Sequence, residues 1–164
     1  MAAKLDEIDV RILKALQTNS RIPVLELAKR AGLSPTACSR RLSRLEKDGI
    51  IQRYCAEISP KVLGLEVTAF VNIRVQQSMQ SAAVFRNAIM KLPNVRGCYL
   101  TAGHHDYIVW VRAKDMASLS KWVTDSLHSI ASVRHTFTTV VLETIKDNPI
   151  PPVGDFVNAE GTLA

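Results

Sequence analysis

SPTACSRRLSRLEKD, residues 34–48, is the stretch around which the chain is organised. Its opening Ser-Pro pair is a helix cap followed by a proline at the first helical position, and Gly49 stands just past its end. Cys38, Leu42 and Leu45 recur at helical spacing and form an apolar stripe. The sequence therefore predicts a helix with well-marked ends and one buried face.

The other face of this helix carries short hydroxyls and long cations instead of the mixture of acids and bases that a solvated helix usually has. A phosphate-lined groove suits such a surface, because cations and hydroxyls both bind phosphate oxygens. Taken alone, the stretch is equally compatible with a solvated amphipathic helix. The residues on this face are Thr36, Ser39, Arg40, Ser43, Arg44 and Lys47.

Two shorter helices are predicted before this stretch. The first is capped by Asp6, with Asp9 three residues on, and ends near Asn19; the second spans Val24–Ala31 and stops at Gly32. Only Gly32, Leu33 and Ser34 separate the second helix from the third, which is the tight glycine-bearing turn of a helix-turn-helix. The three helices together predict a domain that binds double-stranded DNA.

The distribution of charge agrees with that prediction. The 164 residues carry a net charge of +6, and the segment from Arg21 to Arg53 alone holds eight bases against three acids, a net of +5. A basic patch on a compact segment points to a nucleic acid, and no basic helix here has the large exposed apolar face that binds membranes. No apolar run approaches the roughly 18 residues of a membrane span, and the first residues do not resemble a signal peptide, so a cytoplasmic protein is expected.

Beyond a break at Ser59-Pro60 and Gly64, the apolar period changes from 3.6 to 2 residues. The order β-α-β-β-α-β that follows predicts a ferredoxin-like α+β domain with both helices on one face of an antiparallel sheet. Before the break, residues 50–58 read as one further strand. The expected elements of the second domain are strand 67–75, helix 81–92, strands 95–102 and 107–113, a helix capped by Asp115, and strand 133–145.

The predicted domains are a helix-turn-helix DNA-binding domain at 1–60, a hinge at 61–66, an α/β effector-binding and oligomerisation domain at 67–146, and a tail at 147–164. One sheet face of the second domain would be left bare with apolar residues such as Phe70, Leu100, Trp110 or Val140, or their alternating neighbours. Because monomers rarely expose so large an apolar patch, we expect dimerisation through the sheet. The tail is expected to be disordered or draped over a neighbour.

Several short runs together resemble the Lrp/AsnC family of transcriptional regulators, the feast/famine proteins, over nearly the whole chain. The resemblance implies a winged-helix-type N-terminal domain, a hinge, and an α/β domain that dimerises, stacks into tetramers or octamers, and senses amino acids. The matching runs begin with Leu5-Asp6-x-x-Asp9-x-x-Ile12-Leu13 and continue with Glu26-Leu27-Ala28, Gly32-Leu33-Ser34-Pro35-Thr36, Arg40-Arg41-Leu42, Arg44-Leu45-Glu46 and Gly49-Ile50-Ile51.

The helix-turn-helix supplies the candidate DNA-binding residues. Arginine can grip a guanine edge with two hydrogen bonds, and hydroxyls reach bases or phosphates. Thr36, Ser39, Arg40 and Arg44 are assigned to the groove, and Ser34, Arg41, Lys47 and Arg53 to phosphates. For Lys47 and Arg53 a solvated charge is an equal alternative. Arg41 lies beside the apolar stripe, so a structural pairing with an acid such as Glu46 is equally open.

The hairpin loop Ala102-Gly103-His104-His105-Asp106-Tyr107 is the second candidate site. Its glycine could free backbone N–H groups for a carboxylate, and Asp106 could hold an ammonium, although a plain hairpin turn uses the same residues. The family resemblance favours a site, because it implies an amino-acid effector bound between subunits by this loop and the last strand. The implied residues are Gly103, His104, Asp106 and Tyr107, with Thr138, Thr139 and Val140.

The two histidines of the loop depart from the family pattern, in which an acidic residue commonly stands at 104 and an aromatic at 105. The departure predicts an effector other than the usual aliphatic amino acids, or none. Consecutive residues project in diverging directions, so no metal is expected here, and no cofactor site is predicted. Two other functions remain open: an architectural DNA-binding protein of low sequence specificity, and an α+β barrel enzyme with His104 or His105 as base. The sequence shows no second catalytic group that could work with either histidine, so no catalytic residue is assigned.

Overall fold

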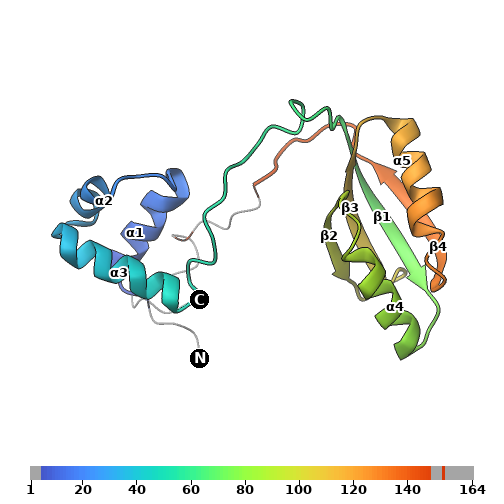
Figure 1. Ribbon diagram of the computed structural model, residues 1–164, viewed down its shortest axis with the longest axis horizontal. Coiled ribbons are helices and arrows are strands. Elements are labelled where there is room, and N and C mark those ends of the chain that lie inside the picture. The colour runs from blue at the N-terminus through green and yellow to red at the C-terminus, as the bar shows by residue number, and fades with distance from the viewer. Residues whose placement is uncertain (1–4, 149–152, 154–164) are drawn as a thin grey trace. The chain divides into compact units, whose positions relative to one another are not determined.

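Three helices form the first unit of the computed structural model, which describes residues 5–148 and 153 (Figure 1). The helices are α1 (Glu7–Thr18), α2 (Val24–Ala31) and α3 (Pro35–Lys47). Ser34 Oγ accepts a hydrogen bond from Ala37 N–H at 3.3 Å at the start of α3, and Asp48 is its C-cap. Gly32 has a φ of 73°, the left-handed conformation that lets α2 stop and the chain turn. The predicted helix-turn-helix is therefore confirmed.

The core of this unit lies where the apolar stripes of the three helices meet. Cys38 and Leu45 of α3 are fully buried, as are Ile12 of α1 and Leu27 of α2. Ile50 and Ile51 pack against the same core, and both of their N–H groups donate to Leu45 O at 3.0 Å. The chain after α3 is thus held against the helix that it has just left.

The predicted strand at residues 50–58 is wrong. No strand forms there, and residues 52–59 are exposed. A strand needs a partner to accept its backbone hydrogen bonds, and no element of the described part of the first unit offers one. Ile50 and Ile51 pack singly against the helical core instead, whereas Tyr54 and Ile58 are exposed.

A four-stranded sheet and two helices form the second unit, with the strands in the order β2-β3-β1-β4 and every neighbouring pair antiparallel. This arrangement confirms the predicted ferredoxin-like α+β fold (Figure 1). A β-bulge between Arg74 and Val75 shifts the register of β1 against β4. The elements in chain order are β1 (Val67–Val75), α4 (Met79–Ile89), β2 (Val95–Leu100), β3 (Tyr107–Ala113), α5 (Met116–Trp122), the π-helical turn η1 (Val123–Leu127) and β4 (Val133–Val140).

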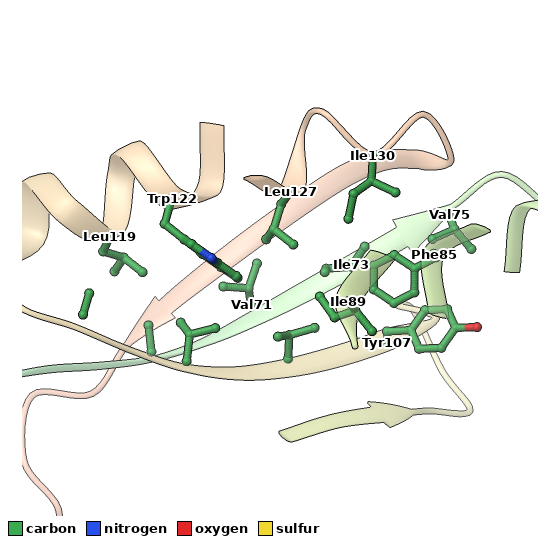
Figure 2. Packing of buried hydrophobic residues seen from close by; sticks show 14 residues of the cluster. Val71, Ile73, Val75, Phe85, Ile89, Tyr107, Leu119, Trp122, Leu127 and Ile130 are labelled. Atoms are coloured by element: carbon green, nitrogen blue, oxygen red, sulfur yellow. The ribbon is translucent and has the colours of Figure 1, made fainter. Parts of the chain in front are cut away.

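Both helices cover the same sheet face, because one continuous core joins side chains of α4 and α5 to alternate residues of β1 and β3 (Figure 2). Phe85 of α4 lies with its ring centroid 4.5 Å from that of Tyr107. Ala69, Val71 and Ile73 of β1 face this core. Their alternating neighbours therefore form the opposite face, which we call the open face.

Phe70 pairs with Trp110 and Thr139 on the open face, and it is 39% exposed. The predicted grouping with Phe70 is wrong for Val140 and Leu100, because Val140 pairs with Ala69 and Leu100 pairs with Tyr107, and both partners face the core. The last strand also ends at Val140, five residues earlier than predicted.

The described chain divides into one unit from Ile58 to Ile145 and another formed by the described residues before Ile58 and after Ile145. Most of the predicted tail, 147–164, lies outside the described residues. Val153 is described: it packs against the core of the helical unit, and its N–H donates to Gln17 Oε1 at 3.2 Å.

Candidate functional site

The side of α3 that turns away from the helical core presents hydroxyls and an unpaired cation. Thr36, Ser39 and Arg40 are all exposed on it. Arg40 makes no ion pair with any residue that the structure describes. Its guanidinium is thus available to a base edge or a phosphate, the two targets that suit its donor geometry.

Arg41 and Arg44, also predicted to bind DNA, are held by the acids at the start of α1. Arg41 Nη1 lies 2.5 Å from Asp6 Oδ2 and 2.9 Å from Asp9 Oδ1, and Arg44 is paired with Asp9 as well. The suggested partner of Arg41, Glu46, is instead the acceptor of Tyr54 OH at 2.7 Å. Both arginines therefore form ion pairs within the helical unit. The sequence pattern did not identify the acids with which they pair.

Asp9 is the centre of this cluster, which we call the Asp9 cluster (Asp6, Asp9, Arg41 and Arg44). The Asp9 side chain is only 1% exposed, whereas Arg41 and Arg44 are 25% and 46% exposed. A buried carboxylate needs partners, because an uncompensated charge in the interior is strongly destabilising. By pairing with two arginines of α3, Asp9 fixes how α3 lies on α1.

The carboxyl group of Asp6 makes the stability of this cluster depend on pH. Its partial burial opposes ionisation, but hydrogen bonds from Asp9 N–H and from the Arg41 guanidinium outweigh this, and the pKa of Asp6 lies below its ordinary value. A lowered pKa in the folded state contributes stability that is present above the unfolded pKa of about 3.9 and is lost as the pH falls through the folded pKa.

We therefore expect Asp6→Asn, which keeps the helix cap, to be less stable than the wild type at pH 7 and equal to it near pH 2. The difference should stay below about 1 kcal/mol, because the Asp6 side chain is half exposed. Thermal unfolding followed by circular dichroism across this pH range measures it. A difference in stability between the two proteins that did not shrink as the pH fell would contradict the stabilising role of the ionised Asp6 carboxylate.

The remaining candidates for phosphate contacts occupy both ends of α3 and the segment after it. Ser34 is the N-cap, so its hydroxyl oxygen is engaged by Ala37 N–H while its O–H remains a donor. Lys47, in the last turn, and Arg53 are exposed. Neither makes an ion pair within the described chain, so both charges are available to a polyanion.

The hairpin loop between β2 and β3 is held by hydrogen bonds to β1. Asp106 Oδ2 accepts from Val75 N–H at 2.8 Å, and Asp106 N–H donates to Ile73 O at 3.0 Å. Arg74 donates from Nε and Nη2 to His104 O, at 3.0 and 2.7 Å. Gly103 has a φ of 155°, which side-chain-bearing residues rarely adopt. The carboxylate of Asp106 thus binds a neighbouring strand, not its own turn.

A cleft of about 400 Å³ opens beside this loop, and we call it the loop cleft. Three of its lining residues, Gly103, His104 and Asp106, belong to the loop that the sequence predicts as a site. The other five come from the end of β1, the turn after it and the start of β4, where the β-bulge sets the register. No local pattern marks them. They are Arg74, Val75, Gln77, Arg134 and His135.

The other candidates for effector binding lie outside the loop cleft. The Tyr107 ring is 3% exposed and packs on Phe85 in the core, so its side chain is a core residue. Thr138 and Thr139 pair with Val71 and Phe70, in the middle of β1 and away from its loop end. Val140 packs against the core. Within one chain, the structure therefore does not bring these four side chains to the cleft.

Other kinds of site receive no support from the described residues. Among residues 5–148 and 153, no three His, Cys, Asp or Glu side chains gather as metal ligands. Burial raises the pKa of the Cys38 thiol, which makes it a poor nucleophile. In the same part of the chain, every helix is too short or too polar to cross a membrane.

Comparison with family models gives one match to each unit. The model described as Lrp/AsnC ligand binding domain matches residues 68–151. The model described as winged helix-turn-helix DNA-binding matches residues 5–52. The two matches contain the loop cleft and the helix-turn-helix, respectively.

Individual relatives align with nearly the full chain. The leucine-responsive regulatory protein of Escherichia coli K12 is 38% identical over 145 residues, which are 88% of each protein. The proline dehydrogenase transcriptional activator of Rhizobium radiobacter is 35% identical over 147 residues, 89% of this chain and 94% of the relative. A transcriptional regulator of Neisseria meningitidis, solved in complex with L-methionine, superimposes with a TM-score of 0.88 at 34% identity, covering 92% of this chain and 98% of that one.

Proposed function

Because this chain belongs to the Lrp/AsnC family of transcriptional regulators, we propose that it is an oligomeric regulator that responds to a free amino acid. The family assigns it a DNA-binding helix-turn-helix and a ligand-binding domain, and its curated relatives regulate transcription and are not enzymes. The observation that carries the proposal is that each unit offers a surface suited to one of these tasks: the outer face of α3 and the loop cleft.

DNA recognition is assigned to Thr36, Ser39 and Arg40 on α3, with Ser34, Lys47 and Arg53 on phosphates. Their exposure and the absence of ion pairs at the three cations, within the described residues, support this. Arg41 and Arg44 hold α3 on α1 in the absence of DNA, so we assign them a positioning role. In a dimer, two such helices would enter successive major grooves about one helical turn apart, or a multiple of it.

Arg40→Ala is expected to weaken binding to the operator by roughly 1–3 kcal/mol, the usual effect of losing a base contact. Folding should be unaffected, because Arg40 has no partner in the described protein. Fluorescence anisotropy with labelled promoter DNA measures the loss, and Lys14→Ala, an exposed cation on α1, is a matched control. Unchanged affinity of the Arg40 variant for the operator would show that Arg40 does not contact the bases.

The effector is assigned to the loop cleft. A fixed carboxylate at Asp106, backbone groups at Gly103 and nearby guanidinium groups are the partners that the ammonium and carboxylate of an amino acid need. The solved relative that holds L-methionine supports the same class of ligand. A thermal-shift screen of the twenty amino acids tests this assignment, since a ligand that binds only the folded state raises the melting temperature. No shift with any of them would contradict it.

Self-association is assigned to the open face of the sheet. Phe70, Tyr99 and Phe137 lie on this face and are 39%, 56% and 62% exposed, which is much apolar surface for one domain. We propose a dimer through this face, built by residues 67–146, joined through a hinge at 61–66 to the DNA-binding residues 1–60, and stacked into tetramers or octamers. Light scattering measures the assembly: a monomer at micromolar concentration would contradict the assignment.

A further inference from the structure

We infer that the loop cleft selects an amino acid whose side chain is itself acidic. The inference rests on the proposed effector site and deepens it by naming the ligand class. Its starting point is the set of fixed charges: Arg74 and Arg134 contribute two positive charges, and Asp106 contributes one negative charge. The cleft therefore carries a net charge of +1 before the two histidines are considered.

Neither guanidinium is neutralised within the described protein. Arg74 donates two N–H groups to His104 O, and Arg134 Nη2 donates to Gln76 Oε1 at 2.6 Å; both acceptors are uncharged. Neither arginine forms an ion pair with a described acid. These bonds hold the two groups in place and leave further N–H donors on each, because a guanidinium has five. Within the part of the chain that the structure describes, the cleft thus presents two hydrogen-bonded cations that no acid pairs with.

The opposite charge is fixed as well. Asp106 Oδ2 is bound by Val75 N–H, and we find no donor on its other carboxylate oxygen among the described residues. That oxygen can accept from an ammonium group. An amino acid with a carboxylate side chain carries one ammonium and two carboxylates, a net charge of −1. It would give Asp106 its cation and each arginine an anion, whereas a neutral amino acid would leave one arginine unmatched.

The lining also disfavours an apolar side chain. Val75 is the only lining residue with a purely aliphatic side chain, and it is 9% exposed. The other lining side chains are Gln77, His104, His135 and the three charged groups. A leucine or methionine side chain would therefore displace water without gaining apolar contact, and it would leave the polar groups poorly paired. An acidic side chain avoids both costs.

Calorimetry on the full chain at fixed ionic strength tests the inference with matched pairs of ligands. L-glutamate and L-glutamine, and L-aspartate and L-asparagine, are nearly isosteric and differ in one charge. At least one acid is expected to bind about tenfold or more tightly than its amide, since a charge-assisted pair with a guanidinium is lost in the amide. Arg134→Gln should remove that ratio. Lys121→Gln, which removes an exposed cation on α5, should preserve it.

The results that overturn the inference differ from those that overturn the proposed function. Tighter binding of leucine, methionine or the amides, with loss of that binding in Asp106→Asn, would overturn the acidic class and keep the amino-acid site. Glutarate binding as tightly as L-glutamate would also overturn it, because the ammonium would then be irrelevant and the ligand a plain dicarboxylate. No binding of any amino acid would overturn both.

Discussion

Asp9→Ala is expected to destabilise the helical unit by about 2–4 kcal/mol, because it removes a buried carboxylate on which two arginines of α3 converge. The lower part of this range allows for the fact that Arg41 and Arg44 can turn towards water once Asp9 is gone. The substitution also removes the acceptor of Asp6 N–H in the capping box of α1. DNA binding should fall with stability, since α3 would lose its fixed position on α1.

Hydrogen exchange at the amides of α1, α2 and α3 measures this loss for the helical unit alone. Both tryptophans, Trp110 and Trp122, lie in the α/β unit, so their fluorescence should report unchanged unfolding there and serve as an internal control. Glu7→Ala, which breaks an exposed pair with Arg11 one turn away, should cost only about 0.3–0.5 kcal/mol. An Asp9 variant no less stable than the Glu7 variant would contradict the structural role of the Asp9 cluster.

Asp106→Asn is expected to reduce affinity for the effector by roughly 100-fold, which corresponds to about 2.7 kcal/mol. Asparagine retains an oxygen that can accept from Val75 N–H, so the loop should keep its conformation while it loses the charge that pairs with the ligand ammonium. Affinity for DNA without effector should be unchanged, because Asp106 belongs to the other unit.

Calorimetry with the amino acid that gives the largest thermal shift measures this effect. Asp125→Asn, an exposed acid of η1 outside the loop cleft, controls for the change in net charge. Asp106→Ala should bind at least as weakly as the asparagine variant, because it loses the bond to β1 as well. Binding by Asp106→Asn with the affinity of the wild type would remove the loop cleft from the effector site.

Local chemistry was enough to predict most elements of the fold. The start of α1 follows from the reciprocal cap of Asp6 and Asp9, and the end of α2 from the left-handed conformation of Gly32. β1 was predicted residue by residue, because a strand with one buried face alternates strictly. Such features depend on neighbours a few positions apart, and they are visible in a single sequence.

The sheet faces and the partners of the arginines could not be predicted in the same way. Whether Val71 or Phe70 faces the helices depends on a packing choice that a period of two leaves open. Arg44 reads as an exposed cation on its own helix, yet its partner Asp9 lies 35 positions earlier. The only acid within α3 is Glu46, five residues after Arg41, and the structure supplies two other acids, Asp6 and Asp9, from the start of α1.

The candidate effector site was predicted only in part for a related reason. Gly103 and Asp106 stand in one loop, so the sequence places them together. Arg74 and Arg134 meet beside that loop because β1 and β4 pair and their register shifts at a bulge. The sequence shows two ordinary surface arginines 60 positions apart.

DNA recognition by α3 is tested most directly by the affinity of the purified protein for its own promoter DNA, measured as a function of salt concentration against a random duplex of equal length. If α3 enters the DNA groove, the protein binds the promoter fragment more tightly, its affinity falls steeply as salt rises, and Arg40→Ala loses the preference. A protein with no salt-dependent affinity for either duplex would contradict the assignment of α3 to the DNA groove.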